Sequence, residues 1–177
     1  MKYYIIAGEA SGDLHGSNLI KELKIINPSS TFRCWGGDLM KSQCNKLVMH
    51  YDDFSYMGFL EVILNAKKIL SYISLCKKDI EEYNPDVIIY IDYPGFNMKI
   101  AEWAKRKNFI NHFYISPKVW VWKEYRVKKI KRVIDKMYVI LPFEEGFYLN
   151  KHNYKVDFVG HPLLDAIDNQ KEFNRQE

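Results

Sequence analysis

Apolar runs of strand length alternate with helical stretches along the chain. The predicted strands lie at residues 3–7, 32–35, 47–50, 87–91, 112–115, 138–141 and 156–159. The predicted helices lie between them, at residues 13–26, 58–83, 97–107, 124–135 and 144–150. This alternation is typical of the α/β class, so we expect a parallel sheet of about seven strands with helices on both faces. Residues 87–91 are apolar at every position, as expected for a strand buried on both sides.

The length and composition fit one folded domain. The chain has 177 residues, of which 47% are hydrophobic and 27% charged, which is typical of a globular protein. We expect residues 1–167 to form the domain and residues 168–177 to be a polar tail or the start of an interdomain linker. The three cysteines are odd in number and form no Cys-x-x-Cys motif, and no signal peptide precedes the first strand, which favours the cytoplasm. No apolar run reaches the roughly 18 residues of a membrane span.

Polar and turn-forming residues follow five of the predicted strands, at residues 8–13, 92–97, 116–120, 142–144 and 160–162. Ligands of open parallel sheets bind at the carboxyl ends of the strands. Each of these segments also makes an ordinary turn, but five of them at one edge predict a binding site there.

The first of these loops is rich in glycine and opens a helix. Free N–H groups at a helix start attract anions or hydroxyls. The loop matches neither the dinucleotide fingerprint nor the P-loop, and Glu9 and Asp13 would repel a pyrophosphate, so a hydroxyl-rich ligand is favoured. The alternative is that Ser11 or Asp13 only caps the helix.

Asp92 is the carboxylate of most interest, because it ends an apolar strand. A partly desolvated carboxylate can have a raised pKa and act as a general base, although a turn aspartate bonded to nearby N–H groups is the alternative. His15 and His161 are secondary candidates near the same edge. No spacing of His, Cys and Asp resembles a metal site, so we expect none.

The predicted helix at residues 58–83 has two apolar stripes. One, expected to face the sheet, contains Phe59, Val62, Ile63, Ala66, Leu70 and Ile73. The second contains Leu60, Leu64 and Leu75 and is flanked by Lys67 and Lys68. The second stripe suits a groove for acyl chains or a membrane-surface contact, unless a neighbouring segment covers it.

A second group of basic residues lies in the predicted helix at residues 124–135 and just before it: Lys123, Arg126, Lys128, Lys129, Lys131 and Arg132. Anionic lipid, phosphate or nucleic acid could bind such a cluster, and a solvated basic face is the simplest alternative. No nucleic-acid-binding motif accompanies it.

Six motifs, in this order, resemble those of the lipid-A-disaccharide synthase family. They are AGEASGD at residues 7–13, MGFLEV at 57–62, IDYPGFN at 91–97, YISPKVWVW at 114–122, LPFE at 141–144 and FVGHPL at 158–163. Each motif alone is modest, but the ordered set covers almost the whole chain and is highly specific.

The resemblance implies the Rossmann-like N-terminal domain of a GT-B glycosyltransferase, inverting and independent of metal. The family joins UDP-2,3-diacylglucosamine to 2,3-diacylglucosamine 1-phosphate in lipid A and lipopolysaccharide biosynthesis, at the cytoplasmic face of the inner membrane. It implies no cofactor, since the UDP-sugar is a substrate, and no nucleic-acid partner; a homodimer of the intact enzyme stays open. The family's second, UDP-binding domain is absent from these residues, so we expect weak acceptor binding and no efficient transfer from this chain alone.

The resemblance also implies roles for single residues. Asp92 matches the family's essential aspartate, the candidate general base for the acceptor 6-hydroxyl. The remaining matches, which fall at positions expected to contact the acceptor, are Glu9, Ser11, Gly12, Met57, Gly58, Glu61, Asn97, Ser116, Trp120, Arg126 and His161. Leu60, Leu64, Lys67, Lys68 and Leu75 are expected to contact acyl chains or the membrane.

Two other functions remain to be weighed. A non-catalytic module that binds lipid or a membrane would share the lysine-edged leucine stripe. A nucleotide-binding domain of an oxidoreductase is disfavoured, because the glycine spacing of the first loop is wrong and Trp35-Gly36-Gly37 stands where an acidic ribose ligand is expected.

Overall fold

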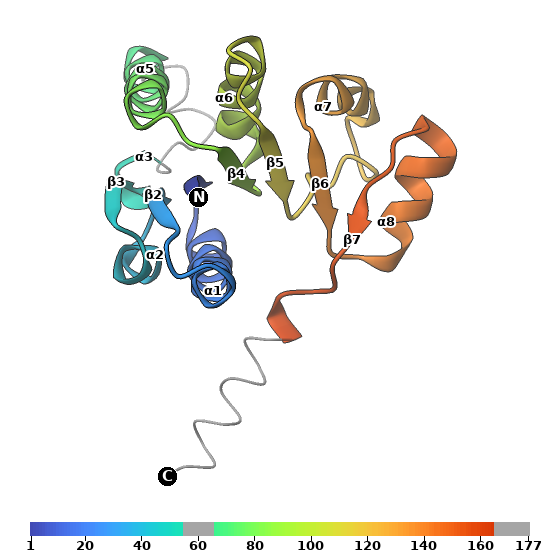
Figure 1. Ribbon diagram of the computed structural model, residues 1–177. Helices are drawn as coiled ribbons and strands as arrows, with labels where there is room; N and C mark the ends of the chain where they lie inside the picture. Colours follow the sequence, from blue (N-terminus) through green and yellow to red (C-terminus); the bar gives the residue numbers. More distant parts are fainter. Residues whose placement is uncertain (55–65, 165–177) are drawn as a thin grey trace.

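The computed structural model describes residues 1–54 and 66–164, which form one twisted sheet with helices on both faces (Figure 1). Within these residues the sheet has seven strands in the order β3-β2-β1-β4-β5-β6-β7, and every neighbouring pair is parallel. The strands are β1 (Lys2–Ala7), β2 (Thr31–Gly36), β3 (Lys46–His50), β4 (Val87–Ile91), β5 (Asn111–Tyr114), β6 (Lys136–Val139) and β7 (Asp157–Phe158). The predicted α/β class and parallel sheet are confirmed.

The helices divide between the two faces of the sheet. In Figure 1, α1 and α2 lie below the sheet, and α5, α6 and α7 lie above it. The helical elements are α1 (Ala10–Ile26), α2 (Asp38–Gln43), α3 (Tyr51–Phe54), α5 (Ala66–Tyr83), α6 (Pro94–Arg106), η1 (Glu124–Arg126), α7 (Val127–Val133), α8 (Pro142–Gly146) and η2 (Phe147–Lys151). In the described part of the chain, no helix has the length and hydropathy of a membrane span.

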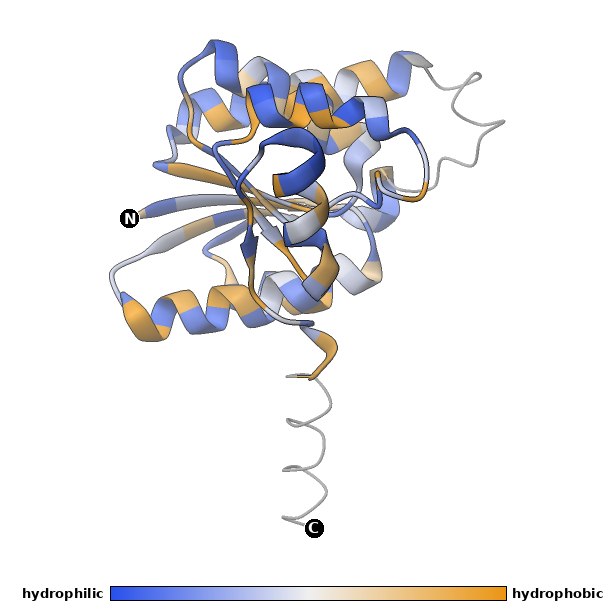
Figure 2. Cartoon of the chain, turned by 90° about the vertical axis from the view of Figure 1, so that its right-hand side faces the viewer, coloured by the Kyte–Doolittle hydropathy of each residue, from blue (hydrophilic) through white to orange (hydrophobic). Residues whose placement is uncertain are grey.

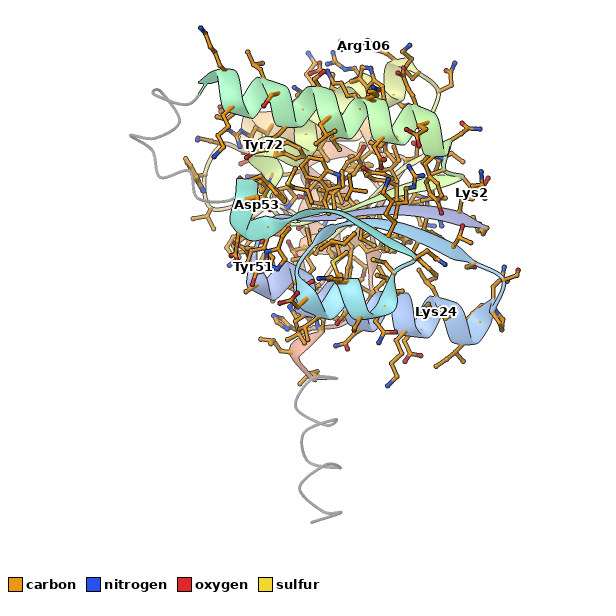
Figure 3. The ribbon with its side chains drawn as sticks, turned by 90° about the vertical axis from the view of Figure 1, so that its left-hand side faces the viewer. Lys2, Lys24, Tyr51, Asp53, Tyr72 and Arg106 are labelled. Atoms are coloured by element: carbon orange, nitrogen blue, oxygen red, sulfur yellow. The ribbon has the colours of Figure 1, made fainter. Side chains whose placement is uncertain are left out.

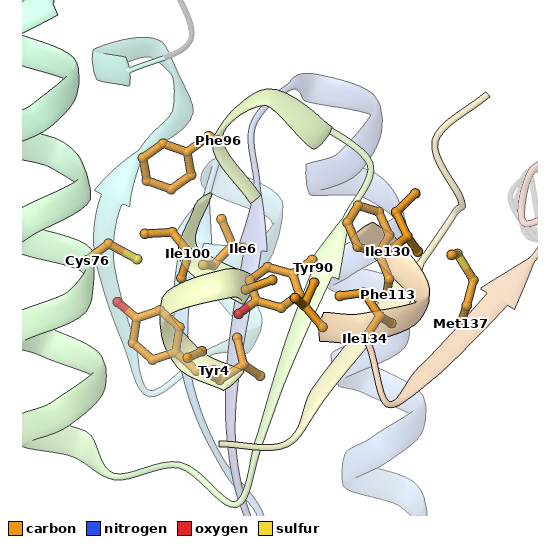
Figure 4. Close-up of a cluster of buried hydrophobic side chains, with 14 of the residues drawn as sticks. Tyr4, Ile6, Cys76, Tyr90, Phe96, Ile100, Phe113, Ile130, Ile134 and Met137 are labelled. Carbon is orange, nitrogen blue, oxygen red and sulfur yellow. The ribbon is translucent and has the colours of Figure 1, made fainter. Parts of the chain in front are cut away.

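Successive side chains of a strand point to opposite faces of the sheet, so the strands contribute to two hydrophobic cores, one on each face. In β1, Tyr4 and Ile6 join the core under α5, α6 and α7, which Figure 4 shows in close-up. Ile5 and Ala7 of the same strand join the core under α1 and α2. Figure 2 shows that the helices carry both polar and apolar residues along their length, as expected for helices with one face on the sheet. All five residues of β4 are buried, as predicted from its continuous apolar run.

Some element boundaries differ from the prediction. Helix α6 begins at Pro94 instead of residue 97, because proline is well suited to the first turn, where its missing N–H is not needed. Helix α1 begins at Ala10 instead of residue 13. The predicted helix at residues 124–135 is the short η1 followed by α7, which ends at Val133. The short helices α2 and α3 were not predicted.

The orientation predicted for the long helix is partly wrong. Ile73 is buried against the sheet as expected, but Leu70 is 63% exposed. The inner positions of α5 are Ile69, Ile73, Cys76 and Ile80, a spacing of three and four residues that places Leu70 about 100° away from Ile69. Of the other residues predicted to face the sheet, Phe59, Val62 and Ile63 lie outside the described residues, as do Leu60 and Leu64 of the second stripe.

The inner face of α5 also reaches the short helix α3. The Tyr72 hydroxyl donates a hydrogen bond of 2.8 Å to the Asp53 carbonyl oxygen. Figure 3 shows Tyr72 on α5 above Asp53 of α3. This bond fixes one edge of a hollow described below.

Candidate functional site

The centre of the sheet is the point at which the connections change faces. Neighbouring strands β1 and β4 pair with Ala7 opposite Ile91, yet β1 leads into α1 on one face and β4 leads into α6 on the other. Ligands of such folds bind in the crevice that opens where the connections diverge. The residues that leave these two strands are Gly8 and Glu9 after β1, and Asp92 and Tyr93 after β4. Glu9 and Asp92 therefore lie where this crevice is expected.

The backbone after β4 has a sharp left-handed turn. Asp92 has φ 43° and Tyr93 has φ 44°, and Ile115 at the end of β5 has φ 65°. Non-glycine residues in this region, a β-branched residue above all, store strain of about 1–3 kcal/mol each and cluster at functional sites. The turn ends the strand abruptly and leaves Asp92 half-buried at the tip of the sheet.

Asn97 holds this turn in place. Its side-chain Nδ2 donates to the carbonyl oxygens of Asp92 at 2.8 Å and Ile91 at 3.3 Å, and the residue is fully buried. The Nδ2 of Asn97 is thus occupied by this turn, whereas its buried Oδ1 has no hydrogen-bond partner in the described part of the chain. The predicted contact of Asn97 with the acceptor stays a prediction.

The electrostatic environment of Asp92 suits a base. Burial raises the pKa of the Asp92 carboxyl, and the negative charge of Glu9 raises it further. The backbone N–H of Tyr93 and the ammonium of Lys118 act in the opposite direction and lower this pKa, but the net shift is upward. A carboxylate with a raised pKa binds a proton more strongly, which makes it a better general base near neutral pH.

The first loop divides into exposed and buried residues. Glu9 and Ser11 are exposed, and the Ser11 hydroxyl donates to the Glu9 carboxylate at 2.7 Å. Gly12 is buried, and a Cβ atom on it would lie 3.1 Å from the Cβ of Ala7, so Gly12 allows helix α1 to pack closely on β1. Glu9 and Ser11 are open to a ligand, whereas Gly12 packs on β1 and its contact with the acceptor stays a prediction.

Asp13 is a structural residue. It is buried, and its carboxylate accepts hydrogen bonds from the backbone N–H groups of Gly37 at 2.7 Å, Met40 at 3.0 Å and Leu39 at 3.1 Å. Asp13 does cap a helix, as the alternative reading of the sequence proposed. The capped helix is α2, however, and not α1, to which Asp13 belongs.

A buried carboxylate that the sequence analysis did not single out organises the far side of the site. Glu144 is 1% exposed. Its Oε1 accepts from the Ser116 hydroxyl at 2.5 Å and the Trp120 indole N–H at 3.3 Å, and its Oε2 accepts from the backbone N–H groups of Ile140 and Leu141. Ser116 is buried and half-buried Trp120 packs edge-on against Phe143, so both are held by the protein itself. The signal in the sequence was a glutamate at the third helical position after a proline at the first.

His161 lies near helix α1. It is close enough to buried His15 that its charge, together with burial as the larger cause, lowers the pKa of His15. The Nδ1 of His161 accepts from the Leu163 backbone N–H at 3.3 Å. In the described residues, no group of three His, Cys, Asp or Glu side chains could hold a metal ion.

Two hollows flank the first turn of α6. The aromatic hollow, of about 200 Å³, is lined by Phe54, Ile69, Tyr72, Tyr93, Gly95, Phe96 and Lys99. The cationic hollow, of about 320 Å³, is lined by Pro94, Gly95, Met98, Lys99, Pro117, Tyr125, Arg126, Lys129 and Ile130. Gly95 and Lys99 belong to both, and Tyr93 and Pro94 follow Asp92 directly in sequence. Arg126, which was predicted to contact the acceptor, lines the cationic hollow.

The predicted lipid-contacting residues are placed in part. Lys67, Lys68 and Leu75 are exposed on α5, and the Nζ of Lys68 lies 5.9 Å from the ring centroid of Tyr72. Leu75 is not among the residues lining the aromatic hollow, whose α5 wall is made by Ile69 and Tyr72. Both predicted roles of Leu75, contact with acyl chains and contact with the membrane, stay predictions. Met57, Gly58, Glu61, Leu60 and Leu64 lie outside the described residues.

Comparisons with known proteins agree with this architecture. A family model described as lipid-A-disaccharide synthetase matches residues 3–177. The chain is 44% identical over 163 residues to lipid-A-disaccharide synthase from Geobacter metallireducens, covering 92% of this chain and 42% of that protein. It is 39% identical over 167 residues to the enzyme of the same name from Francisella philomiragia, covering 94% and 44%. The chain therefore spans less than half the length of these relatives.

Solved structures with low sequence identity share the fold. UDP-GlcNAc 2-epimerase from Neisseria meningitidis, bound to UDP-GlcNAc, matches with a TM-score of 0.71 at 14% identity, over 99% of this chain and 50% of that one. Sucrose-phosphate synthase from Thermosynechococcus elongatus matches with a TM-score of 0.57 at 12% identity, over 99% and 98%. These likenesses show the Rossmann-like fold of a GT-B domain.

Proposed function

The chain belongs to the lipid-A-disaccharide synthase family, and on this basis we propose that it is the acceptor-binding half of a glycosyltransferase that forms lipid A disaccharide 1-phosphate. In this proposal the donor is UDP-2,3-diacylglucosamine and the acceptor is 2,3-diacylglucosamine 1-phosphate. The donor is a substrate, so no cofactor is needed. Recognition of a UDP-sugar by enzymes of related fold, such as the epimerase bound to UDP-GlcNAc, supports the choice of donor.

The observation that supports this function most is the place of Asp92. Its half-buried carboxylate lies where the β1 and β4 connections diverge, and the residues that follow it line both hollows. An amphiphilic acceptor needs an apolar surface for acyl chains and a polar region for its sugar and phosphate, and the aromatic and cationic hollows offer these on either side of α6.

The proposed reaction is a single displacement. Asp92 takes the proton of the acceptor 6-hydroxyl, whose oxygen forms a bond to the anomeric carbon of the donor. The bond from that carbon to the UDP oxygen breaks, and its electron pair leaves with UDP. Because the attack comes from the opposite face, the configuration inverts, and no metal ion is required if charged and N–H groups stabilise the departing diphosphate.

Other residues have supporting roles in this proposal. Glu9 and Ser11 face the crevice from the first loop, where they can bind sugar hydroxyls and where Glu9 keeps the pKa of Asp92 raised. Trp120 offers an aromatic face held by Glu144. Contacts of Met57, Gly58 and Glu61 with the acceptor remain predictions.

We also propose that the intact protein works at the cytoplasmic surface of the inner membrane as a peripheral protein. Lys67, Lys68 and Lys78 are exposed along α5 with Leu70 and Leu75, a combination suited to anionic lipid headgroups. The second candidate function, a lipid-binding module without catalysis, is supported by this same surface. It predicts lipid binding that does not depend on Asp92.

The test is a transfer assay on a chimera that joins this chain to the part of the Geobacter metallireducens relative beyond the match. We expect disaccharide formation from the two proposed substrates, and a fall in kcat/KM of about 10²–10⁴-fold for Asp92→Asn, as for loss of a general base. The matched control is Asp38→Asn, an exposed carboxylate outside the site, which should leave transfer unchanged. Unchanged transfer by Asp92→Asn would refute the proposed role, and lipid binding without transfer by the parent chimera would favour the non-catalytic module.

A further inference from the structure

We propose that the cationic hollow between α6 and α7 binds a phosphate monoester, and that in the enzyme it takes the anomeric phosphate of the acceptor sugar. The second half of this statement rests on the proposed function, whereas the anion site itself does not.

The charges around the cationic hollow are not all neutralised by the protein. Lys129 forms an ion pair of 2.7 Å with Glu102, which also pairs with Arg132 at 3.3 Å. Lys99 and Arg126, by contrast, form no ion pair among the residues that the structure describes. Two cations therefore line one concave surface whose lining includes no carboxylate, and their combined positive potential attracts an anion.

The chemistry of these side chains favours phosphate over a carboxylate or a neutral ligand. The guanidinium of Arg126 offers planar, paired donors that match two oxygens of one phosphate, and the ammonium of Lys99 adds a point charge from the opposite wall. A phosphate monoester carries close to two negative charges at neutral pH, so it can satisfy both cations at once.

Helix α6 adds to the positive potential. It is 13 residues long, its first residues Pro94 and Gly95 are part of the wall, and no side chain caps its N-terminus. The N–H groups and dipole at such a helix start favour an anion. This contribution is independent of the two side chains and acts at the same place.

The rest of the cationic hollow suits a sugar attached to the phosphate. Its volume of about 320 Å³ lies in the range of small-molecule sites and leaves room beyond one phosphate group. Its remaining walls are formed by Met98, Pro117, Tyr125 and Ile130, apolar and aromatic surfaces of the kind that pack on the face of a pyranose ring.

The cationic hollow is also connected to the candidate base. A smaller hollow of about 60 Å³ shares Pro94, Pro117 and Arg126 with it and adds Lys118 and Lys123. Lys118 lies close enough to Asp92 to lower the pKa of its carboxyl. A phosphate held by Lys99 and Arg126 would thus anchor one end of the sugar while Asp92 receives a hydroxyl at the other, which is the positioning that the displacement needs.

The experiment measures binding of α-glucosamine 1-phosphate, inorganic phosphate and glucosamine to the 177-residue chain by amide chemical shifts. We expect glucosamine 1-phosphate to bind more tightly than inorganic phosphate, and glucosamine not to bind detectably. Lys99→Gln and Arg126→Gln should each raise the dissociation constant about tenfold, a usual result of losing one charge-assisted hydrogen bond. Lys128→Gln is the matched control, because this exposed lysine has the same charge and lies on the same helix as Lys129, outside the cationic hollow.

Each outcome decides the proposal. Parent-like affinity for glucosamine 1-phosphate in both Lys99→Gln and Arg126→Gln would overturn the anion site, as would an equal loss in Lys128→Gln, which would indicate a diffuse surface charge. Equal affinity for the two phosphates would overturn the assignment to a sugar phosphate. Vesicles of phosphatidylglycerol test whether the site binds a lipid headgroup instead of a sugar phosphate. We expect the vesicles not to compete with glucosamine 1-phosphate. Competition would overturn the assignment of the hollow to a sugar phosphate.

Failure of this inference is distinguishable from failure of the proposed function. If glucosamine 1-phosphate binds as described but the chimera transfers no sugar, the anion site stands and the proposed activity fails. If the chimera is active and Lys99→Gln and Arg126→Gln leave the KM for the acceptor unchanged, the proposed activity stands and the phosphate site fails.

Discussion

The ring of Tyr93 lies directly over the backbone of Gly8, so that a Cβ atom placed on Gly8 would fall 2.3 Å from Cδ1 of the ring. This contact joins the loops after β1 and β4 at the centre of the sheet. Tyr93 has a left-handed conformation and lines the aromatic hollow, and Glu9, which follows Gly8, raises the pKa of Asp92 by its negative charge. The close approach of these two loops therefore requires a residue without a side chain at position 8.

Substituting this glycine tests the contact. Gly8→Ala must displace Tyr93, whose Cγ and Cδ2 would lie 2.4 and 2.9 Å from the new Cβ, and overpacking of this kind destabilises by about 1–3 kcal/mol. Urea unfolding of parent and variant measures the difference in the free energy of unfolding.

Gly95→Ala is the matched control. No atom lies within 4 Å of a Cβ placed there, and the residue is helical, so alanine should stabilise the chain by about 0.5 kcal/mol. If Gly8→Ala is as stable as Gly95→Ala, Tyr93 does not lie over Gly8.

The raised pKa of Asp92 predicts how its substitution changes stability with pH. Between its usual value of 3.8 and the raised value, the folded chain binds more protons at Asp92 than the unfolded chain does. The free energy of unfolding of the parent should therefore fall, through this group, as pH rises across that interval. Asp92→Asn has no carboxyl at this position and so does not lose stability in this way. Its free energy of unfolding in urea, relative to that of the parent, should therefore increase as the pH rises from 4 to 7. A relative loss over the same range would mean that the pKa of Asp92 is lowered.

Glu144 is expected to be important for stability and for the position of Trp120. Glu144→Gln replaces one acceptor oxygen with a donor in a site surrounded by N–H and O–H donors, and should destabilise by about 2–3 kcal/mol. The indole N–H resonance of Trp120 should also shift. Glu145→Gln, next in sequence but exposed, should change stability by less than about 0.5 kcal/mol and leave that resonance in place; similar effects of the two variants would exclude the proposed network.

Asp13 is expected to stabilise helix α2 without taking part in binding. Asp13→Ala leaves three backbone N–H groups without their acceptor and should reduce the free energy of unfolding by about 1–3 kcal/mol. Asp38→Ala, an exposed residue of the same helix, is the comparison and should change it by less than about 0.5 kcal/mol. A larger effect at Asp38 than at Asp13 would contradict this assignment.

Local patterns in the sequence were enough to predict the sheet and to choose the edge that holds the candidate site. The five apolar residues of β4 indicated a buried central strand. Asp92 was singled out because it is the polar residue that directly follows this strand. The order of the strands in space, and thus the crevice between β1 and β4, follows from tertiary packing that no local pattern contains.

The differences from the prediction arise from contacts between residues far apart in sequence. The bonds from Asp13 to Gly37 and from Glu144 to Ser116 span 24 and 28 positions, so neither partner could be chosen from spacing alone. Leu70 was assigned to the inner face of its helix because it continues the spacing of three and four residues that joins Ala66 to Ile73. The face that packs inward is set by the aromatic and aliphatic side chains that meet it, such as Tyr4 and Ile100.

The most direct test of the account is a crystal structure of the chain with a short-chain analogue of 2,3-diacylglucosamine 1-phosphate. We predict the 6-hydroxyl oxygen within about 3.2 Å of a carboxylate oxygen of Asp92, with the phosphate between Lys99 and Arg126. An analogue bound with a different carboxylate or imidazole nearer to that hydroxyl than Asp92 would contradict the central claim that Asp92 receives the acceptor proton.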